Sequence, residues 1–231
     1  MTLSQDGRYY NFKNPEESYE YLYRMNYAHD VLYKIEREMK QLNSYCAYTL
    51  LSTDRKNNEF RKQIDNIKSG KKVELEVSKD IYNIIEDDNS GEFGHVLEEL
   101  EIDVENWEEN LSFIAPAMTL VLLHIFVEKS LRSICIEFHS SKNPTIKKES
   151  DESVIQSYIR FLNHECKLNF SISDDILTLQ NECRIIRNRF AHGDWKTVNE
   201  KIQNINLVET FYSVTKMFET IEESLPGNKT S

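Results

Sequence analysis

Arginine, asparagine and histidine side chains lie close together in the segment IIRNRFAHGDW, residues 185–195. Arg187, Asn188 and His192 are the residue types that phosphodiester chemistry uses. A guanidinium can hold a phosphate through two hydrogen bonds and stabilise the charge of a five-coordinate transition state. A histidine can abstract a proton from a 2′-hydroxyl or protonate the departing 5′-oxygen. Because the attacking oxygen comes from the RNA itself, such a cleavage needs no metal, and the set indicates a catalytic trio in which Asn188 orients one of the other groups.

Four neighbouring side chains are candidates for binding the substrate: Arg184, Arg189, Trp195 and Lys196. Arg184 is one helical turn from Arg187 and shares its face. Trp195 can stack on a base and Lys196 can contact a phosphate, although packing over the helix end explains both equally well. The spacing alone is also compatible with a purely structural interpretation, in which the arginines complement the helix dipole and His192 packs in an ordinary cap.

The bulk composition restricts the partners that the chain can have. The 231 residues carry a net charge of −11, which excludes a general nucleic-acid-coating protein but leaves room for a small, locally basic site. Four cysteines are widely spaced without a CxxC pair, which predicts reduced thiols and a cytoplasmic protein. Residues 164–166 (HEC) have metal-capable types, but neighbours in a helix point apart. We therefore expect no metal and no other cofactor.

The sequence is typical of a helical protein without a membrane segment. Six glycines and four prolines are few for a fold rich in tight turns. The start of the chain lacks a signal-peptide pattern. The apolar stretch 113–127 is shorter than the roughly 20 residues that span a bilayer, and we expect a buried core helix there.

Apolar periodicity and capping residues predict the order of the elements. A long helix begins at an Asn14 cap, and a short helix follows a Ser78 cap. The expected elements are a helix from 14 to about 67, a short strand or an extended connector at 72–77, a short helix at 78–85, an acidic loop at 86–94, an acidic helical segment from about 95, and helices at 111–139, 152–166, 174–192 and 198–225.

Several side chains in these helices have a predicted environment. Ile186 and Phe190 belong to the buried face of the helix that carries the trio. Glu128 interrupts an apolar helix and needs a partner, which is either Arg132 at i+4 or Arg187. His124 is expected to be a core histidine with one satisfied nitrogen. The tyrosines between residues 19 and 33 are a half-buried helix face rather than a stacking platform for bases.

The hexamer RNRFAH resembles the signature of the HEPN superfamily, in which an arginine, usually followed by a polar residue such as asparagine, is separated from a histidine by four to six intervening residues. Arg187, Asn188 and His192 match it position by position. The segment MTLVLLHIFVEKSLRSIC resembles the long apolar helix of that family, with Glu128 as its embedded glutamate. IQSYIRFLN and LQNECRIIRNRFAHG follow in the expected order, so the resemblance covers about residues 111–225.

The resemblance implies an all-α fold, an up-and-down helical bundle at 111–231 preceded by an amino-terminal helical extension at 1–110. It also implies a homodimer with a composite site and metal-independent endoribonuclease activity, which leaves a 2′,3′-cyclic phosphate. Family members act in toxin–antitoxin and antiviral defence systems, so an antitoxin or defence-system protein is an expected partner. One subgroup has a nucleotidylated tyrosine where this chain has Asp194. The alternative is a non-catalytic HEPN module that binds nucleotides or a partner protein.

Overall fold

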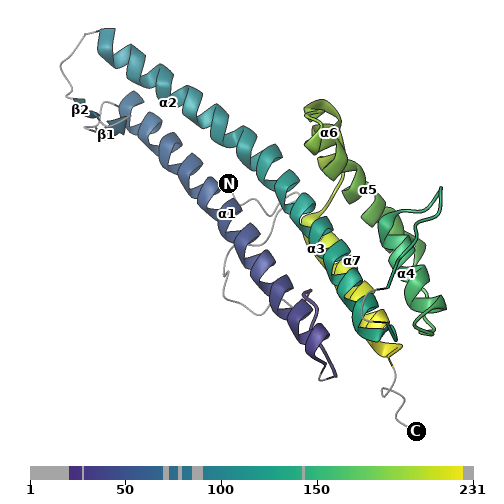
Figure 1. Cartoon of the computed structure of the whole chain (residues 1–231). Helices are drawn as coiled ribbons and strands as arrows, with labels where there is room; N and C mark the ends of the chain where they lie inside the picture. The colour runs from purple at the N-terminus through teal and green to yellow at the C-terminus, as the bar shows by residue number, and fades with distance from the viewer. Residues whose placement is uncertain are drawn as a thin grey trace. The chain divides into compact units, whose positions relative to one another are not determined.

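Helices make up most of the computed structural model, which describes residues 21–27, 29–69, 73–77, 80–84, 91–141 and 144–225 (Figure 1). The expected all-α class is confirmed. The chain divides into two compact units. One contains the described residues up to Ala47 together with those from Pro116 onward, and the other is Tyr48–Ala115. This division does not follow the expected boundary at residue 110, because the start of the long first helix packs with the carboxyl-terminal helices.

Helix α1 (Asp30–Lys68) ends where the sequence predicts but begins later. Asn14 lies outside the described residues, whereas Tyr21–Tyr27 form turns and extended chain, so the expected unbroken helix from residue 14 is wrong. Hydrogen bonds to α7 (Leu207–Glu223) hold this non-helical segment. Thr215 donates to the carbonyl oxygen of Tyr21 over 2.6 Å, and Tyr23 donates to Glu222 over 3.0 Å. Tertiary contacts thus override the helical pattern.

The unit at 48–115 contains the second half of α1, strands β1 (Val73–Val77) and β2 (Asp80–Ile84), helix α2 (Gly91–Glu109) and the π-helical turn η2 (Asn110–Ile114). The strands pair antiparallel, with Val73 opposite Ile84 and Val77 opposite Asp80. The prediction of β1 is confirmed, but the short helix predicted after Ser78 is wrong because that segment is β2. Its β-branched and aromatic residues favour a strand once a partner strand is adjacent. The 86–94 loop lies mostly outside the described residues, although α2 begins at Gly91.

Apolar side chains of α1 and α2 form the core of this unit. Ile64 and Ile67 pack with Val96 and Leu100, and partly buried Phe60, Leu97 and Val104 border them. Lys68 and Glu101 form an ion pair over 2.8 Å at the edge of this core, and Arg61 pairs with Glu108. Exposed pairs of this kind contribute little to stability, so the apolar contacts hold the two helices together.

A π-helical turn precedes helix α3 (Ala115–Phe138), and Pro116 explains it. The Ala115 N–H bonds to the carbonyl oxygen of Asn110, five residues earlier. A proline has no N–H and its ring clashes with the carbonyl four residues back, so the regular ladder is interrupted there. By length and composition the helical run Gly94–Phe138 could cross a membrane, but 61% of its apolar window is buried within the protein. The predicted core helix at 113–127 is therefore observed as η2 and α3.

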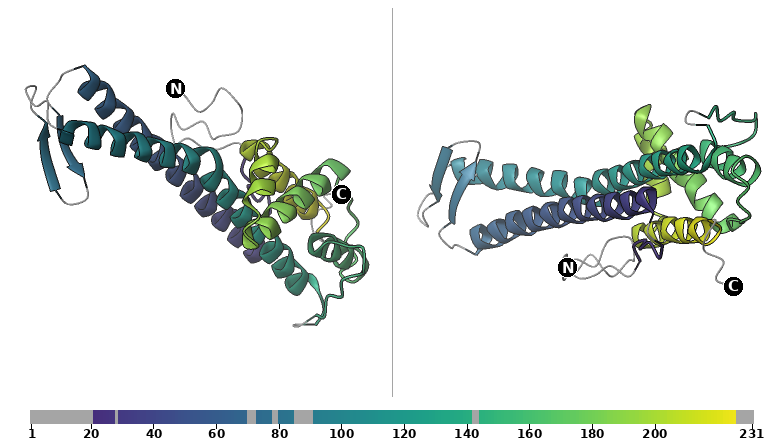
Figure 2. Two further views of the ribbon diagram at one scale, coloured as in Figure 1. Left: turned by 90° about the horizontal axis from the view of Figure 1, so that it is seen from above. Right: turned by 60° about the horizontal axis from the view of Figure 1, so that its bottom comes forward.

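Helices α4 (Val154–His164), α5 (Asp174–Ala191) and α6 (Trp195–Ile202) join α3 and α7 in the other unit (Figure 2). Phe126 of α3 packs edge-on against Phe218 of α7, with ring centroids 6.0 Å apart. The single helix expected at 198–225 is wrong, because the chain breaks after Ile202 and restarts at α7. The Asn206 side chain accepts a hydrogen bond from the Glu209 N–H and caps α7.

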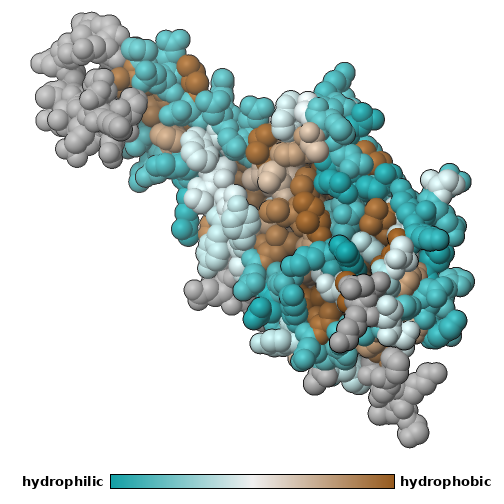
Figure 3. All heavy atoms as spheres, viewed as in Figure 1, coloured by the Kyte–Doolittle hydropathy of each residue, from teal (hydrophilic) through white to brown (hydrophobic). Residues whose placement is uncertain are grey.

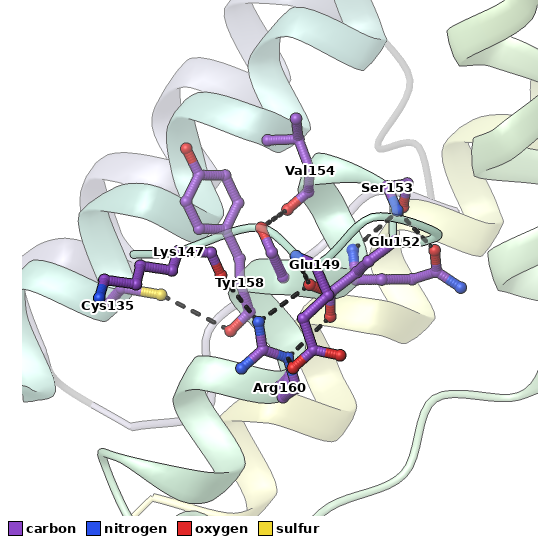
Figure 4. A network of polar contacts seen from close by, with 10 residues as sticks. Cys135, Lys147, Glu149, Glu152, Ser153, Val154, Tyr158 and Arg160 are labelled. Atoms are coloured by element: carbon purple, nitrogen blue, oxygen red, sulfur yellow. Dashed lines mark hydrogen bonds and ion pairs between the residues drawn. The ribbon is translucent and has the colours of Figure 1, made fainter. Parts of the chain in front are cut away.

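The loop before α4 is fixed by a polar network (Figure 4). Arg160 donates to Glu152 over 2.9 Å and to the carbonyl oxygen of Lys147 over 2.7 Å. Ser153 and Gln156 form a reciprocal capping box at the start of α4. The Cys135 thiol of α3 lies 3.7 Å from the carbonyl oxygen of Tyr158. The network therefore attaches the loop and α4 to the helix that faces the candidate site.

Candidate functional site

Helix α5 carries the predicted trio, and its buried face fixes the directions of the trio's side chains. Cys183 and Ile186 are buried as predicted. Phe190 is only half-buried, which corrects the prediction, and its ring meets Trp195 edge-on at 4.9 Å. Trp195 starts α6 and keeps 47% of its surface exposed. The two rings pack where α5 ends, so the packing interpretation of Trp195 holds while part of the indole stays accessible.

Gly193 ends α5 as the sequence predicts, with a φ of +72° that favours glycine. The Asp194 N–H closes the turn by donating to the carbonyl oxygen of Arg189 over 3.0 Å. One carboxylate oxygen of Asp194 accepts from the Thr197 N–H and caps α6, and the other lies 3.2 Å from Nη1 of Arg189. These contacts lower the pKa of Asp194, with the Thr197 hydrogen bonds as the main cause. Arg189 thus stabilises the helix end.

Arg187 pairs with Glu128 of α3, which decides between the two partners considered for that glutamate. Its Nη2 atom lies 3.2 Å and 3.4 Å from the two carboxylate oxygens. The arginine side chain remains 34% exposed. Its Nε atom is buried without a hydrogen-bond partner in the described part of the chain. Nη1 makes no polar contact with the described residues either, so the guanidinium has hydrogen-bonding capacity left.

His124 supports Glu128 from the preceding turn of α3. The imidazole is 1% exposed, and its Nε2 atom lies 3.3 Å from Oε1 of Glu128. The expected core position of His124 is confirmed, but the expected satisfied nitrogen is not, since neither ring nitrogen has a hydrogen-bond partner of good geometry among the described residues and Nε2 only approaches Glu128. The pKa of Glu128 is lowered, first by the contact with His124 and further by Arg187, against the opposing effect of burial.

Arg187 and His192 do not meet within one chain. His192 is exposed and Asn188 is half-buried, and no contact joins either of them to Arg187 in the described residues. Five residues of helix rotate a side chain by about 140° relative to the first, so the two groups diverge from the same helix end. A site that uses both therefore needs a substrate that bridges them or a second copy of the chain.

Of the other two side chains predicted to contact the substrate, one already has a partner within the protein and one is exposed. Arg184 donates to the Asn181 side chain through Nε and Nη2 over 3.1 Å and 2.9 Å. Lys196 is exposed at the start of α6. The sequence did not identify His124 as part of this site. The i,i+4 spacing of two polar residues inside an apolar helix was the available signal.

The cysteines are unsuited to nucleophilic chemistry. Burial raises the pKa of both Cys135 and Cys183 to about 12, and that of Cys46 to about 11. All four cysteines are free. No group of three or more His, Cys, Asp or Glu residues that could hold a metal ion is found in the described ranges.

The geometry of α3 and α5 brings together Arg187, Glu128 and His124 and leaves His192 at an exposed helix end. This arrangement can offer a positioned guanidinium to an anion, and an exposed imidazole at the end of the same helix. Comparison of the chain with protein-family models, with curated proteins and with solved structures finds no match.

Proposed function

We propose that the protein is a metal-independent endoribonuclease of a toxin or antiviral defence type. The observation that carries the proposal is the Arg187–Glu128 pair, in which a carboxylate holds a half-exposed guanidinium by one nitrogen and leaves Nη1 without a partner in the described chain. Such an arginine is positioned before substrate arrives, so little conformational entropy is lost when a phosphate binds.

In this reaction the 2′-oxygen attacks the adjacent phosphorus and the bond from phosphorus to the 5′-oxygen breaks. His192 accepts the proton of the 2′-hydroxyl, and the histidine of a second copy gives a proton to the departing 5′-oxygen. Arg187 stabilises the charge on the phosphoryl oxygens, and Asn188 orients the RNA or the imidazole. The products are a 2′,3′-cyclic phosphate and a 5′-hydroxyl. A homodimer explains how side chains that diverge within one chain act on one phosphate.

The test is RNA cleavage in the presence of EDTA. We expect the wild-type protein to cleave total RNA, and His192→Ala and Arg187→Ala each to lower the rate by at least about 100-fold, as removal of an acid–base group or an oxyanion donor does. Arg55→Ala is the control, because Arg55 is an exposed arginine of α1 that belongs neither to the candidate site nor to the candidate substrate contacts. Cyclic-phosphate ends identify the chemistry. A wild-type protein that is inert as a purified dimer contradicts the proposal.

The same ion pair also favours a second function, a non-catalytic helical module that binds a partner protein or a nucleotide. Glu128 offsets the charge of Arg187, as it would in a purely structural pair. The Arg187→Met substitution separates the two functions. A non-catalytic module predicts that neither the wild type nor the variant cleaves RNA and that the variant loses only stability, whereas the nuclease predicts a wild-type cleavage activity whose loss in the variant exceeds the loss of folded protein.

A further inference from the structure

The exposed face of the first half of α1 differs in charge from the rest of this acidic protein. Between Val31 and Ala47 the exposed side chains are all basic, tyrosine or glutamine; they are Tyr33, Lys34, Arg37, Lys40, Gln41 and Tyr45. We call these six residues the α1 face. An unbroken stretch of helix surface without an exposed carboxylate is unexpected in a chain with a net charge of −11.

The two glutamates of this stretch are turned away from solvent and occupied. Glu36 accepts hydrogen bonds from the Met25 N–H and from Lys40, and these contacts lower its pKa against the effect of burial. Glu38 pairs with Lys129 of α3 over 3.0 Å. Lys34 and Arg37 have no polar partner among the described residues. Two cations of the α1 face are thus available to an anion, while the carboxylates that would neutralise them are engaged.

Two tyrosines, one arginine and one glutamine follow one row of the α1 face. Tyr33, Arg37, Gln41 and Tyr45 follow at four-residue spacing, so their side chains are neighbours on successive turns. Tyr45 is 62% exposed, and Tyr33 is 54% exposed, which corrects the expectation that the tyrosines up to residue 33 form a half-buried helix face. Twelve residues of helix separate the two rings by about 18 Å along the axis. The rings can therefore stack on different bases of one strand while Arg37 and Lys34 contact the phosphates between them.

We propose that the α1 face is a binding surface for single-stranded RNA, an inference that rests on the proposed nuclease for the identity of its ligand. Exposed aliphatic side chains are absent from this part of α1, whereas a stable protein interface needs an apolar centre. Exposed aromatic rings between unpaired cations instead suit a polyanion with flat bases. RNA is favoured over an acidic protein on this ground.

The α1 face is placed to serve the same RNA as Arg187. Successive residues of α3 contact the two neighbouring helices, since Glu128 pairs with Arg187 of α5 and Lys129 pairs with Glu38 of α1 (Figure 1). Arg37 is adjacent to Glu38 on α1. The α1 face and Arg187 thus belong to two helices that both form an ion pair with α3, at successive residues of that helix. Figure 3 shows a band of apolar side chains between hydrophilic ones on one face of the molecule. Met118 and Ile125 are exposed apolar side chains of α3.

The test measures RNA binding without cleavage, in the full-length chain carrying His192→Ala. The probe is a fluorescein-labelled oligouridylate of about 16 nucleotides, titrated by fluorescence anisotropy at several KCl concentrations. Adding Tyr33→Ala and Tyr45→Ala together is expected to weaken binding by about tenfold or more. Adding Lys34→Gln and Arg37→Gln is expected to lower the slope of log affinity against log salt by about 1.4, for two lost phosphate contacts.

Tyr212→Ala is the matched control, because Tyr212 of α7 is also exposed and has Lys216 beside it, but Lys216 pairs with Glu219. This variant is expected to bind as the parent does. The proposal is overturned if the double tyrosine variant binds within about twofold of the parent, or if polyglutamate displaces the RNA at equal charge, which would indicate an acidic-protein surface. If the α1 face binds RNA but the wild-type protein does not cleave it, the proposed nuclease activity is refuted and the proposed RNA-binding surface stands.

Discussion

Glu222 and Glu128 are carboxylates of the same compact unit. The hydrogen-bonding groups around Glu222 are paired, whereas several of those around Glu128 are not. Glu222 is fully buried and accepts from the Tyr23 hydroxyl and from the backbone N–H groups of Asn26 and Tyr27, over 2.7–3.0 Å. Around Glu128, by contrast, Nε of Arg187 and both ring nitrogens of His124 are buried without hydrogen-bond partners in the described chain. A satisfied buried network stabilises one arrangement, whereas unpaired donors cost free energy and indicate a site that waits for a ligand.

The largest effect is expected at Glu222. Glu222→Ala leaves one buried hydroxyl and two backbone N–H groups without their acceptor. Each such group costs about 1–3 kcal/mol, so for three of them we expect the free energy of unfolding to fall by at least about 3 kcal/mol. Urea denaturation followed by circular dichroism measures it. Glu223→Ala, at the exposed neighbouring position, should change it by less than about 0.5 kcal/mol. Equal losses of stability in Glu222→Ala and Glu223→Ala would contradict the stabilising role of the Glu222 network.

A smaller effect that depends on pH is expected at Glu128. Glu128→Gln should lower the free energy of unfolding by about 1–2 kcal/mol at neutral pH, since the pair with Arg187 is partly screened by solvent. The folded-state pKa of Glu128 lies below its ordinary value of 4.5. The contribution of the carboxylate is therefore present above about pH 4.5 and is lost as pH falls through the lowered folded-state pKa. Thermal unfolding of both proteins from pH 7 to pH 3 should show the difference shrinking, and a constant difference would contradict this assignment.

The smallest effect is expected when a single donor is removed from the Glu222 network. Tyr23→Phe removes one of its donors and keeps the ring, which packs against Phe218 with centroids 5.7 Å apart. We expect a loss of about 1 kcal/mol, the net contribution of one hydrogen bond. Tyr212→Phe, at an exposed position of α7, should leave the free energy of unfolding unchanged. A loss above about 3 kcal/mol in a chemical denaturation curve would mean that the hydroxyl supports more than one bond.

Sequence patterns predicted the elements that depend on local signals and missed those that depend on packing. Gly193 ends α5 because a left-handed turn favours glycine there. The sequence pattern does not indicate the break between α6 and α7, because Ile202, Ile205 and Val208 continue the helical spacing across it. Asn206, with Glu209 three residues later, was the available sign of a new helix.

The candidate site divides in the same way. The RNRFAH segment located the helix end and its residues, because the signature is a local one. Which acceptor Arg187 meets depends on how α3 and α5 pack, so spacing along the chain left Glu128 with two possible partners. The role of His124 depends on the same packing. Its position one turn before Glu128 becomes meaningful only once Glu128 is seen to bind Arg187, because His124 then contacts a carboxylate that holds the candidate site.

The hydrogen bonds of Glu222 have a consequence for the order of folding. They join groups that are 195 to 199 residues apart in the chain, as far as any contact described in this protein. During synthesis, the segment at residues 21–27 leaves the ribosome long before α7 exists. Contacts of such large sequence separation form slowly, because the intervening chain must first be ordered. The hydroxyl and amide groups that Glu222 binds therefore stay hydrated until the last helix is made, and the amino-terminal segment is among the last parts of the unit to become fixed.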